Sequence, residues 1–452
     1  MDPRWLVDSH EPENRGKFSP RRENSEPRRK RHADYTIGWI CALPVEVAAS
    51  KAMLELYHPP LPQGGNDHNV YTLGELYGHN IVIACLPSGV YGISSASTVA
   101  AQMLNTFPGI RFSLMVGVGG GVPGHFTADV RLGDVVVSKP TSTFGGVVQY
   151  DIGKALGNHR FQRTGVLNRP PSILLAAVSR LEADHMLNQS KIPSELEAML
   201  DKYPNMDAFS HPGSEHDALF EPDYQHVEPN DKMCRNCDAQ YQVRRRARRS
   251  ESPRIHYGLI ASGSQVIRDA PTRDMIAQEL GGEVLCFEME AAGLMGDFPC
   301  LVIRGICDYA DSHKNKHWQP YAAAVAAAYA KELLSVIPMT QVVNAPDARD
   351  RYSADSRGFT RMPEYQDRQQ IPPWQSVWEV QESEETARTP ETEAMSTGGF
   401  ALFALLGCPE CKVVEDWQGS GQQIWFCCSC GDGPRSMANN VECAQCGHRM
   451  RP

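Results

Sequence analysis

The sequence of 452 residues lacks any apolar run long enough to cross a membrane, and its first residues lack the apolar core of a secretory signal peptide. Net positive charge is also missing: 44 Lys and Arg residues stand against 54 Asp and Glu residues, for a formal net charge of -10. This balance argues against a general nucleic-acid-binding surface. We therefore expect an intracellular protein, cytoplasmic or nuclear, with no membrane partner.

Hydrophobic residues make up 41% of the chain, enough for one large core. Residues 34–340 alternate strand and helix patterns and predict an α/β domain with an insertion at about 153–254. Residues 1–33 predict a disordered basic tail or a nuclear-localisation signal, and residues 341–400 predict a disordered linker because few apolar residues are present to offset the entropy of ordering. Residues 401–452 form a separate cysteine-rich module. Predicted strands of the α/β domain include 35–43, 80–86, 114–122, 134–139 and 300–306, and predicted helices include 92–107, 172–187, 271–280 and 318–337.

Three acidic residues stand at predicted element ends within residues 285–311, which read LCFEMEAAGLMGDFPCLVIRGICDYAD. Glu288 and Glu290 precede an alanine-rich stretch that predicts a helix, and Asp308 follows the apolar strand 300–306. Ligands of open α/β sheets bind outside the carboxyl ends of the strands, so these acids are candidate functional residues. Helix dipoles and turn geometry alone also favour acids at such positions.

The EMEAA segment and the strand end RGICD, which runs from Arg304 to Asp308, resemble the signature of the purine/uridine phosphorylase and nucleosidase superfamily. Within this superfamily the chain resembles methylthioadenosine/S-adenosylhomocysteine nucleosidases and nucleoside-phosphorylase-like domains of fungal proteins that resemble immune receptors. The resemblance implies a three-layer α/β fold with a central mixed sheet flanked by helices. It also implies a homo-oligomer, in which a neighbouring subunit can complete the pocket.

Cleavage of a purine N-glycosidic bond leaves positive charge on the ribosyl ring and negative charge on the departing base. The site therefore needs acceptors for the ribose hydroxyls and an acid near purine N7. The resemblance implies that Met289 and Glu290 hold the ribose, with Glu288 and Arg304 beside them in the substrate site. It implies that Asp308 donates to N7.

Two further segments carry the resemblance. Pro44 opens a helix after the first strand, and Glu46 in its first turn matches the family glutamate that activates the attacking water, although the helix dipole alone also favours an acid there. Residues 114–122, LMVGVGGGV, predict a strand that runs into glycines, which let backbone N–H groups approach an anion or the ribose, or form a tight turn. The candidate substrate-binding residues of this segment are Val118, Gly119 and Gly120.

Residues 258–269, GLIASGSQVIRD, match a family segment that contacts the base, which gives that role to Val266 and Ile267. Val118 stands where relatives have a hydroxyl that contacts phosphate or water, and residues 44–50 lack the phosphate-gripping Gly-Asp and Arg pattern of many phosphorylases. Both absences favour water over phosphate as the nucleophile. Cys307 replaces a family serine and donates only weakly.

The insertion ends in a basic run, RRRARR, at 244–249. This run either grips a phosphorylated 5′ end of the substrate or forms an exposed loop. It is preceded by a C-x2-C pair, Cys234 and Cys237.

The C-terminal module contains two C-x2-C pairs behind Trp425, separated by twelve residues. Four thiolates at such spacing suit a tetrahedral structural zinc ion, and the pattern resembles the Ran-binding-protein type of zinc finger, whose members bind ubiquitin or single-stranded RNA. A zinc ribbon that uses Cys408 and Cys411, or a disulfide framework, is an alternative. The predicted ligands are Cys427, Cys430, Cys443 and Cys446.

Three functions fit these residues. The first is hydrolysis of a purine nucleoside or nucleotide to free base and ribosyl product, with no cofactor for catalysis. The second is phosphorolysis, which yields ribose 1-phosphate. The third is a catalytically degenerate nucleoside-sensing or scaffold module, which Val118 and Cys307 favour.

Overall fold

A computed structural model describes residues 30–124, 129–157, 161–228 and 234–349 in full. The chain divides into two compact units, Met1–Thr360 and Arg361–Pro452. No helix in the described part of the chain combines the length and apolar character that a membrane span requires. In the second unit only the backbone of a three-stranded antiparallel sheet is described, formed by β13 (Lys412–Glu415), β14 (Gln423–Phe426) and β15 (Arg435–Ser436).

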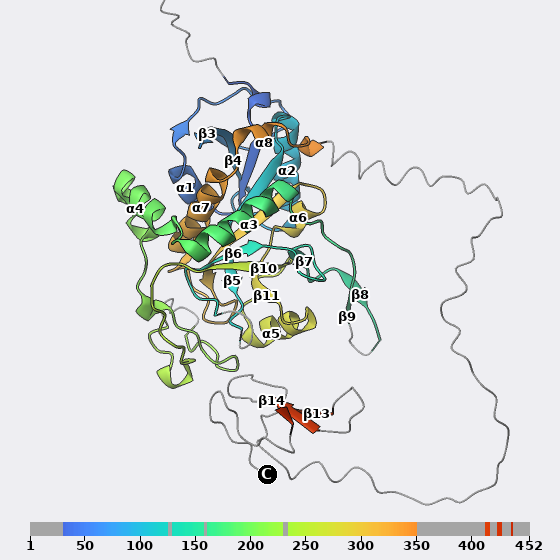
Figure 1. Ribbon diagram of the computed structural model, residues 1–452, viewed down its shortest axis with the longest axis vertical. Coiled ribbons are helices and arrows are strands. Elements are labelled where there is room, and N and C mark those ends of the chain that lie inside the picture. The colour runs from blue at the N-terminus through green and yellow to red at the C-terminus, as the bar shows by residue number, and fades with distance from the viewer. Residues whose placement is uncertain are drawn as a thin grey trace, which may run out of the picture. The chain divides into compact units, whose positions relative to one another are not determined.

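A ten-stranded sheet lies at the centre of the first unit (Figure 1). Its strands are β1 (Ile37–Cys41), β2 (Leu56–Tyr57), β3 (Tyr71–Leu76), β4 (His79–Cys85), β5 (Phe112–Gly121), β6 (Val135–Ser138), β7 (Val147–Gln149), β10 (Ile255–Ser262), β11 (Val284–Glu288) and β12 (Cys300–Asp308). The strand order is β11-β10-β6-β12-β5-β1-β4-β3-β2, and β7 pairs with β10. β1 runs parallel to β4 and β5, whereas β12 runs parallel to β5 and antiparallel to β6, so the sheet is mixed.

Helices cover both faces of this sheet. They are α1 (Pro44–Ala52), α2 (Ile93–Thr106), α3 (Ser172–Leu187), α4 (Ile192–Lys202), α5 (Ala270–Glu279), α6 (Ala292–Met295), α7 (Gln319–Ser335) and α8 (Met339–Val343). Trp39 of β1 packs in a core with α1, α3, α4 and α7, whereas the next residue, Ile40, packs in a second core with α2 and α6. Successive strand residues point to opposite faces, so burial on both sides explains why β1 reads as a continuous apolar run. The predicted three-layer α/β class with a mixed sheet is confirmed.

The alanine-rich helix α7 packs against β12, the strand that ends at Asp308. A side chain at Gly305 would collide with the carbonyl of Ala322, so the helix backbone packs directly on β12. Small residues on both sides permit this approach. The contact fixes the position of β12 against α7 at Gly305, three residues before Asp308.

The element positions agree with the sequence prediction except around the paired glutamates. Glu288 is the last residue of β11, not the start of a helix, and the helix that follows, α6, has only four residues. The Glu288 carboxylate accepts hydrogen bonds from the backbone N–H groups of Glu290 and Ala291, at 3.1 and 3.0 Å. This acid therefore organises the turn between β11 and α6.

Packing of the first unit reaches beyond both ends of the predicted 34–340 interval. A short 3-10 helix, η1 (His32–Asp34), precedes β1, and the buried Ala348 donates its backbone N–H to the carbonyl of Ile110 at 3.1 Å. The insertion contributes the hairpin β8 (Gly153–Ala155) and β9 (Phe161–Arg163), the helices α3 and α4, and three 3-10 helices: η2 (Pro204–Phe209), η3 (Ser214–His216) and η4 (Ala239–Tyr241).

Candidate active site

One cavity of about 290 Å³ collects acids from three separate segments of the chain. Glu46 comes from α1, Glu290 from the turn after β11, and Asp308 from the end of β12. All three side chains are buried. The full lining is Ala42, Leu43, Glu46, Tyr91, Val118, Gly119, Gly120, Gln265, Val266, Ile267, Phe287, Glu288, Met289, Glu290, Cys307, Asp308, Ala310, Lys314, Lys316 and Gln319.

Glu46 is held in place by backbone N–H groups of the β1–α1 connection and of β5. Its Oε2 accepts from Ala42 and Leu43, at 2.7 and 2.9 Å, and its Oε1 accepts from Val118 at 2.9 Å. Burial raises the pKa of Glu46, although Arg304 and these hydrogen bonds oppose the shift. A carboxylate with a raised pKa is a stronger base than an exposed one.

Glycines in β5 make room for the acids. A Cβ at Gly117 would collide with Oε1 of Glu46 and would lie 2.7 Å from Nη1 of Arg304. A Cβ at Gly120 would lie 2.8 Å from Oδ1 of Asp308. The glycine run that the sequence analysis connected with backbone approach therefore also admits two of the carboxylates.

Glu46, Glu288 and Glu290 form an acidic wall of the cavity. Arg304 lies outside the cavity lining and neutralises part of the negative charge of this wall. Its Nη2 forms a short ion pair with Oε2 of Glu288 and lies 3.4 Å from Oε2 of Glu290, and the guanidinium is fully buried. Burial raises the pKa of Glu290 to about 7, with Arg304 opposing and Glu288 reinforcing the shift. Because one cation faces three carboxylates, those of Glu46, Glu288 and Glu290, this wall favours a ligand that carries positive charge.

Asp308 carries an ion pair that the sequence did not predict. Nζ of Lys314 lies 3.0 Å from Oδ2 and 3.1 Å from Oδ1 of Asp308, and the Cys307 thiol donates to Oδ2 at 3.0 Å. Burial alone would lower the pKa of Lys314, but the Asp308 carboxylate outweighs it and the pKa is raised. Burial, reinforced by Asp308, raises the pKa of Cys307 well above its usual value, so the thiol stays protonated.

The structure brings together every predicted site residue of the α/β domain except Arg304, which lies behind the cavity wall and reaches it through Glu288 and Glu290. Val266 is 52% exposed, whereas its neighbour Ile267 is buried. Several lining residues were not predicted as site residues. They include Tyr91, Lys314, Lys316 and Gln319, which lie outside the motif segments, and Gln265, which lies within residues 258–269.

The basic run at 244–249 contributes nothing to the lining of this cavity. Arg245 pairs with Asp217 at 2.9 Å and donates to the Tyr309 hydroxyl at 2.7 Å. Arg248 pairs with the buried Asp134 at 2.6 Å. Two arginines of the run therefore have structural partners, so the run is not a wholly exposed loop. The run also lies outside the cavity lining, which argues against binding of a phosphorylated 5′ end in this cavity.

The four predicted zinc ligands of the C-terminal module, Cys427, Cys430, Cys443 and Cys446, lie outside the described residues. The same holds for the alternative pair, Cys408 and Cys411.

The first unit is thus a three-layer α/β domain with an acid-lined cavity at the carboxyl ends of β5, β11 and β12. The chain is 47% identical over 305 residues to a nucleotide-binding leucine-rich repeat (NLR)-like protein of Hyaloscypha variabilis, a match that covers 67% of the chain and 29% of that relative. It is 24% identical over 310 residues to the 5′-methylthioadenosine/S-adenosylhomocysteine nucleosidase of Mycobacterium tuberculosis, covering 67% of the chain and 97% of the nucleosidase. No protein-family model matches the chain.

Solved nucleosidases also align with the first unit. The 5′-methylthioadenosine/S-adenosylhomocysteine nucleosidase of Neisseria meningitidis, in complex with methylthio-immucillin-A, aligns at a TM-score of 0.43 and 18% identity, over 66% of the chain and 98% of the nucleosidase. Futalosine hydrolase of Helicobacter pylori aligns at a TM-score of 0.41 and 18% identity, over 67% of the chain and 98% of the hydrolase.

Proposed function

We propose that the first unit cleaves the N-glycosidic bond of a purine nucleoside or nucleotide by hydrolysis, releasing the free base and a ribosyl product. The observation that carries the proposal is the meeting of Glu46, Glu290 and Asp308 around one cavity of about 290 Å³. The similarity to methylthioadenosine/S-adenosylhomocysteine nucleosidases supports the choice of a purine nucleoside.

Each acid has a chemical role in this proposal. Glu46 orients the attacking water and takes its proton, and the raised pKa of Glu46 suits that role. Glu290 accepts hydrogen bonds from the ribose hydroxyls, with Met289 beside the sugar. Asp308 passes a proton to N7 as negative charge develops on the base, and the Lys314 ammonium, 3.0 Å from Oδ2, can replace that proton on Asp308.

The negative wall favours water over phosphate as the nucleophile. The N–H groups of Ala42, Leu43 and Val118 would be natural donors to an anion, but the Glu46 carboxylate accepts from all three. Phosphate at that position would meet the charges of Glu46 and Glu290 directly. A ribosyl ring with developing positive charge is stabilised by the same charges.

The test is base release measured by chromatography from adenosine, inosine, methylthioadenosine and ATP, each with and without phosphate. We expect release without phosphate, and a loss of about 10²–10⁴-fold in Asp308→Asn, the range for a general acid. Asp297→Asn, at an exposed aspartate outside the cavity, is the matched control and should retain full activity. Release only with phosphate would establish phosphorolysis instead, and full activity in Asp308→Asn would refute the mechanism.

A sensor or scaffold role is the second candidate, and the Lys314–Asp308 ion pair favours it. A neighbouring cation stabilises a carboxylate in its deprotonated form, which has no proton to donate. If none of the four substrates releases base but one of them binds in calorimetry, with binding lost in Glu290→Gln, the unit is a nucleoside sensor.

For the second unit we propose a structural zinc ion on Cys427, Cys430, Cys443 and Cys446, with ubiquitin or single-stranded RNA as its partner. The support is the C-x2-C spacing.

A further inference from the structure

We infer that the insertion of the first unit binds a zinc ion through His226, Cys234 and Cys237. One ligand atom of each residue lies within 4.8 Å of the other two. A tetrahedral zinc ion with Zn–S of about 2.3 Å and Zn–N of about 2.0 Å holds such atoms roughly 3.6–3.8 Å apart. If the three ligand atoms move closer together by about an ångström, they can form three of the four bonds of a zinc ion.

The backbone between the cysteines forms a tight turn. Cys237 donates its N–H to the Cys234 carbonyl at 3.2 Å, and Cys234 has a φ of 53°. Few residues other than glycine adopt that left-handed conformation, so the turn holds Cys234 in a strained state. A short turn that brings two thiols together is the usual carrier of two zinc ligands.

His313 supplies the fourth ligand. Its side chain is buried, and its Nε2 has no hydrogen-bond partner among the described residues. Phe220 stacks on the ring at 4.1 Å, and the ring centroids of His313 and His226 lie 5.4 Å apart. Two imidazoles on one tetrahedral zinc ion place their centroids roughly 5 Å apart. A buried imidazole nitrogen without a partner is costly, and a metal bond removes that cost.

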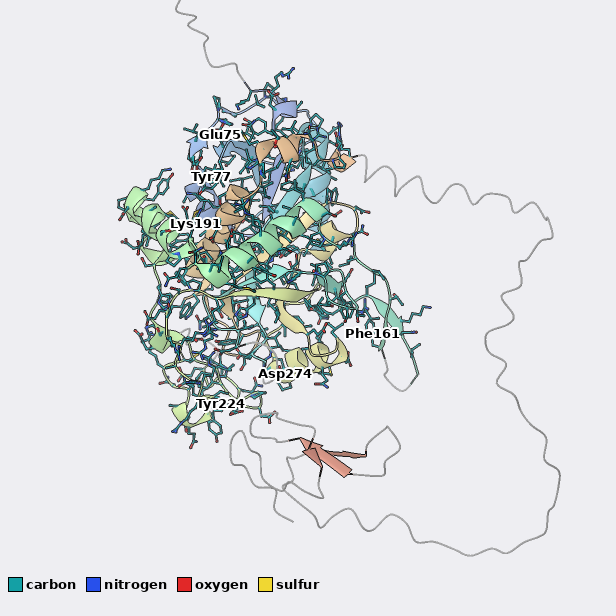
Figure 2. The ribbon with its side chains drawn as sticks, viewed as in Figure 1. Glu75, Tyr77, Phe161, Lys191, Tyr224 and Asp274 are labelled. Atoms are coloured by element: carbon teal, nitrogen blue, oxygen red, sulfur yellow. The ribbon has the colours of Figure 1, made fainter. Side chains whose placement is uncertain are left out.

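A closed set of two cysteines and two histidines leaves no position open for a substrate, so the ion stabilises the structure. It would join the insertion to the loop that follows β12. His226 already donates its backbone N–H to Oγ of Ser312 at 3.0 Å, and Tyr224, labelled in Figure 2, stacks near His313. Cys234, Cys237 and His313 line a pocket of about 210 Å³ together with Cys307 and Asp308, so the ion lies behind the strand end of the candidate active site.

The first test uses the unmodified full chain. The protein is alkylated with and without prior treatment by a strong chelator, and each cysteine is followed by peptide mass spectrometry. We expect Cys234 and Cys237 to be protected until the chelator removes zinc. Equal alkylation in both samples, or recovery of a peptide with a Cys234–Cys237 disulfide, would overturn the inference.

The second test measures zinc per chain in variants. Cys237→Ser should contain about one zinc ion fewer than the parent, whatever the C-terminal module binds, whereas Cys85→Ser, at a partly buried cysteine outside the cluster, should match the parent. Cobalt replaces zinc in a parallel sample, where His313→Asn should alter the visible bands of a tetrahedral thiolate site. Unchanged zinc in Cys237→Ser refutes the site, and unchanged cobalt bands in His313→Asn refute the fourth ligand.

Discussion

At the residue scale, Arg304 determines how the acids of the cavity can coexist. It is the one cation that contacts Glu288 and Glu290 among the described residues, and both its η nitrogens are engaged. Its Nε is buried without a partner in that part of the chain. Burying a charge is costly unless the charge is paired. Arg304 therefore holds two carboxylates of the wall in place rather than contacting a ligand.

Glu290 makes the stability of the first unit depend on pH. Its folded pKa of about 7 lies above its ordinary value of 4.5, so the protonated form favours folding. This contribution is fully present below pH 4.5 and is lost as the pH rises through 7. A glutamine at this position cannot ionise, so Glu290→Gln does not lose this stability at high pH. The unfolding free energy of the variant should exceed that of the parent by about 1–3 kcal/mol at pH 8.

Urea unfolding at pH 8 and pH 5 measures this effect. The advantage of Glu290→Gln should shrink toward pH 5, because the parent carboxyl is then protonated as well. Glu279→Gln, at an exposed glutamate of α5, should show no such trend. An advantage of equal size at both pH values would contradict the assignment.

At the element scale, β5 must stay free of side chains where it passes the acids. Gly117→Ala places a methyl group against Glu46 and Arg304, so we expect base release to fall at least about 10-fold and stability to fall by about 1–3 kcal/mol. Gly64→Ala is the control, because no atom lies within 4 Å of the added methyl. Wild-type activity in Gly117→Ala would mean that Glu46 can move without consequence.

A buried acid of α7, Glu332, holds the segment of the insertion that joins α3 to α4. Glu332 accepts hydrogen bonds from His185, Ser190 and the backbone of Lys191, at 3.0, 2.9 and 2.9 Å. Lys191, at the start of α4, is labelled in Figure 2. Glu332→Ala leaves these donors without an acceptor and should cost about 1–3 kcal/mol. Hydrogen exchange should quicken first in α4, and Glu279→Ala should leave it unchanged. Uniform quickening across the unit would contradict a local anchor.

Several features of the molecule follow from the sequence and several do not. Continuous apolar runs identify β1 and β12 because both faces of these strands are buried, and the EMEAA and RGICD segments identify Glu290 and Asp308. Lys314 escaped prediction because its partner is set by the path of a loop. The ion pairs of Arg245 and Arg248 were not predicted either, because their partners, Asp217 and Asp134, are distant in sequence. Local patterns predict elements, whereas ion pairs between distant segments need the fold.

At the scale of the whole molecule, the two units should separate without loss of the chemistry. Every lining residue of the cavity and every ligand of the inferred zinc site lies within Met1–Thr360. A fragment ending at Thr360 should therefore release base within about 2-fold of the full chain, as an independently folding domain would. It should retain one zinc ion on the His226 cluster and lose the ion proposed for the C-terminal module.

Three measurements on this fragment and the full chain check the separation: base release, zinc per chain, and mass by light scattering.

We expect both proteins to form the same homo-oligomer. Exposed apolar residues beside the cavity, Val90, Tyr91 and Val266, lie in the first unit and are suited to contact a second copy of the chain. Tyr91→Glu should break this assembly, and Tyr77→Glu, at an exposed tyrosine outside the cavity, should not. A monomeric fragment from an oligomeric full chain would instead assign assembly to Arg361–Pro452.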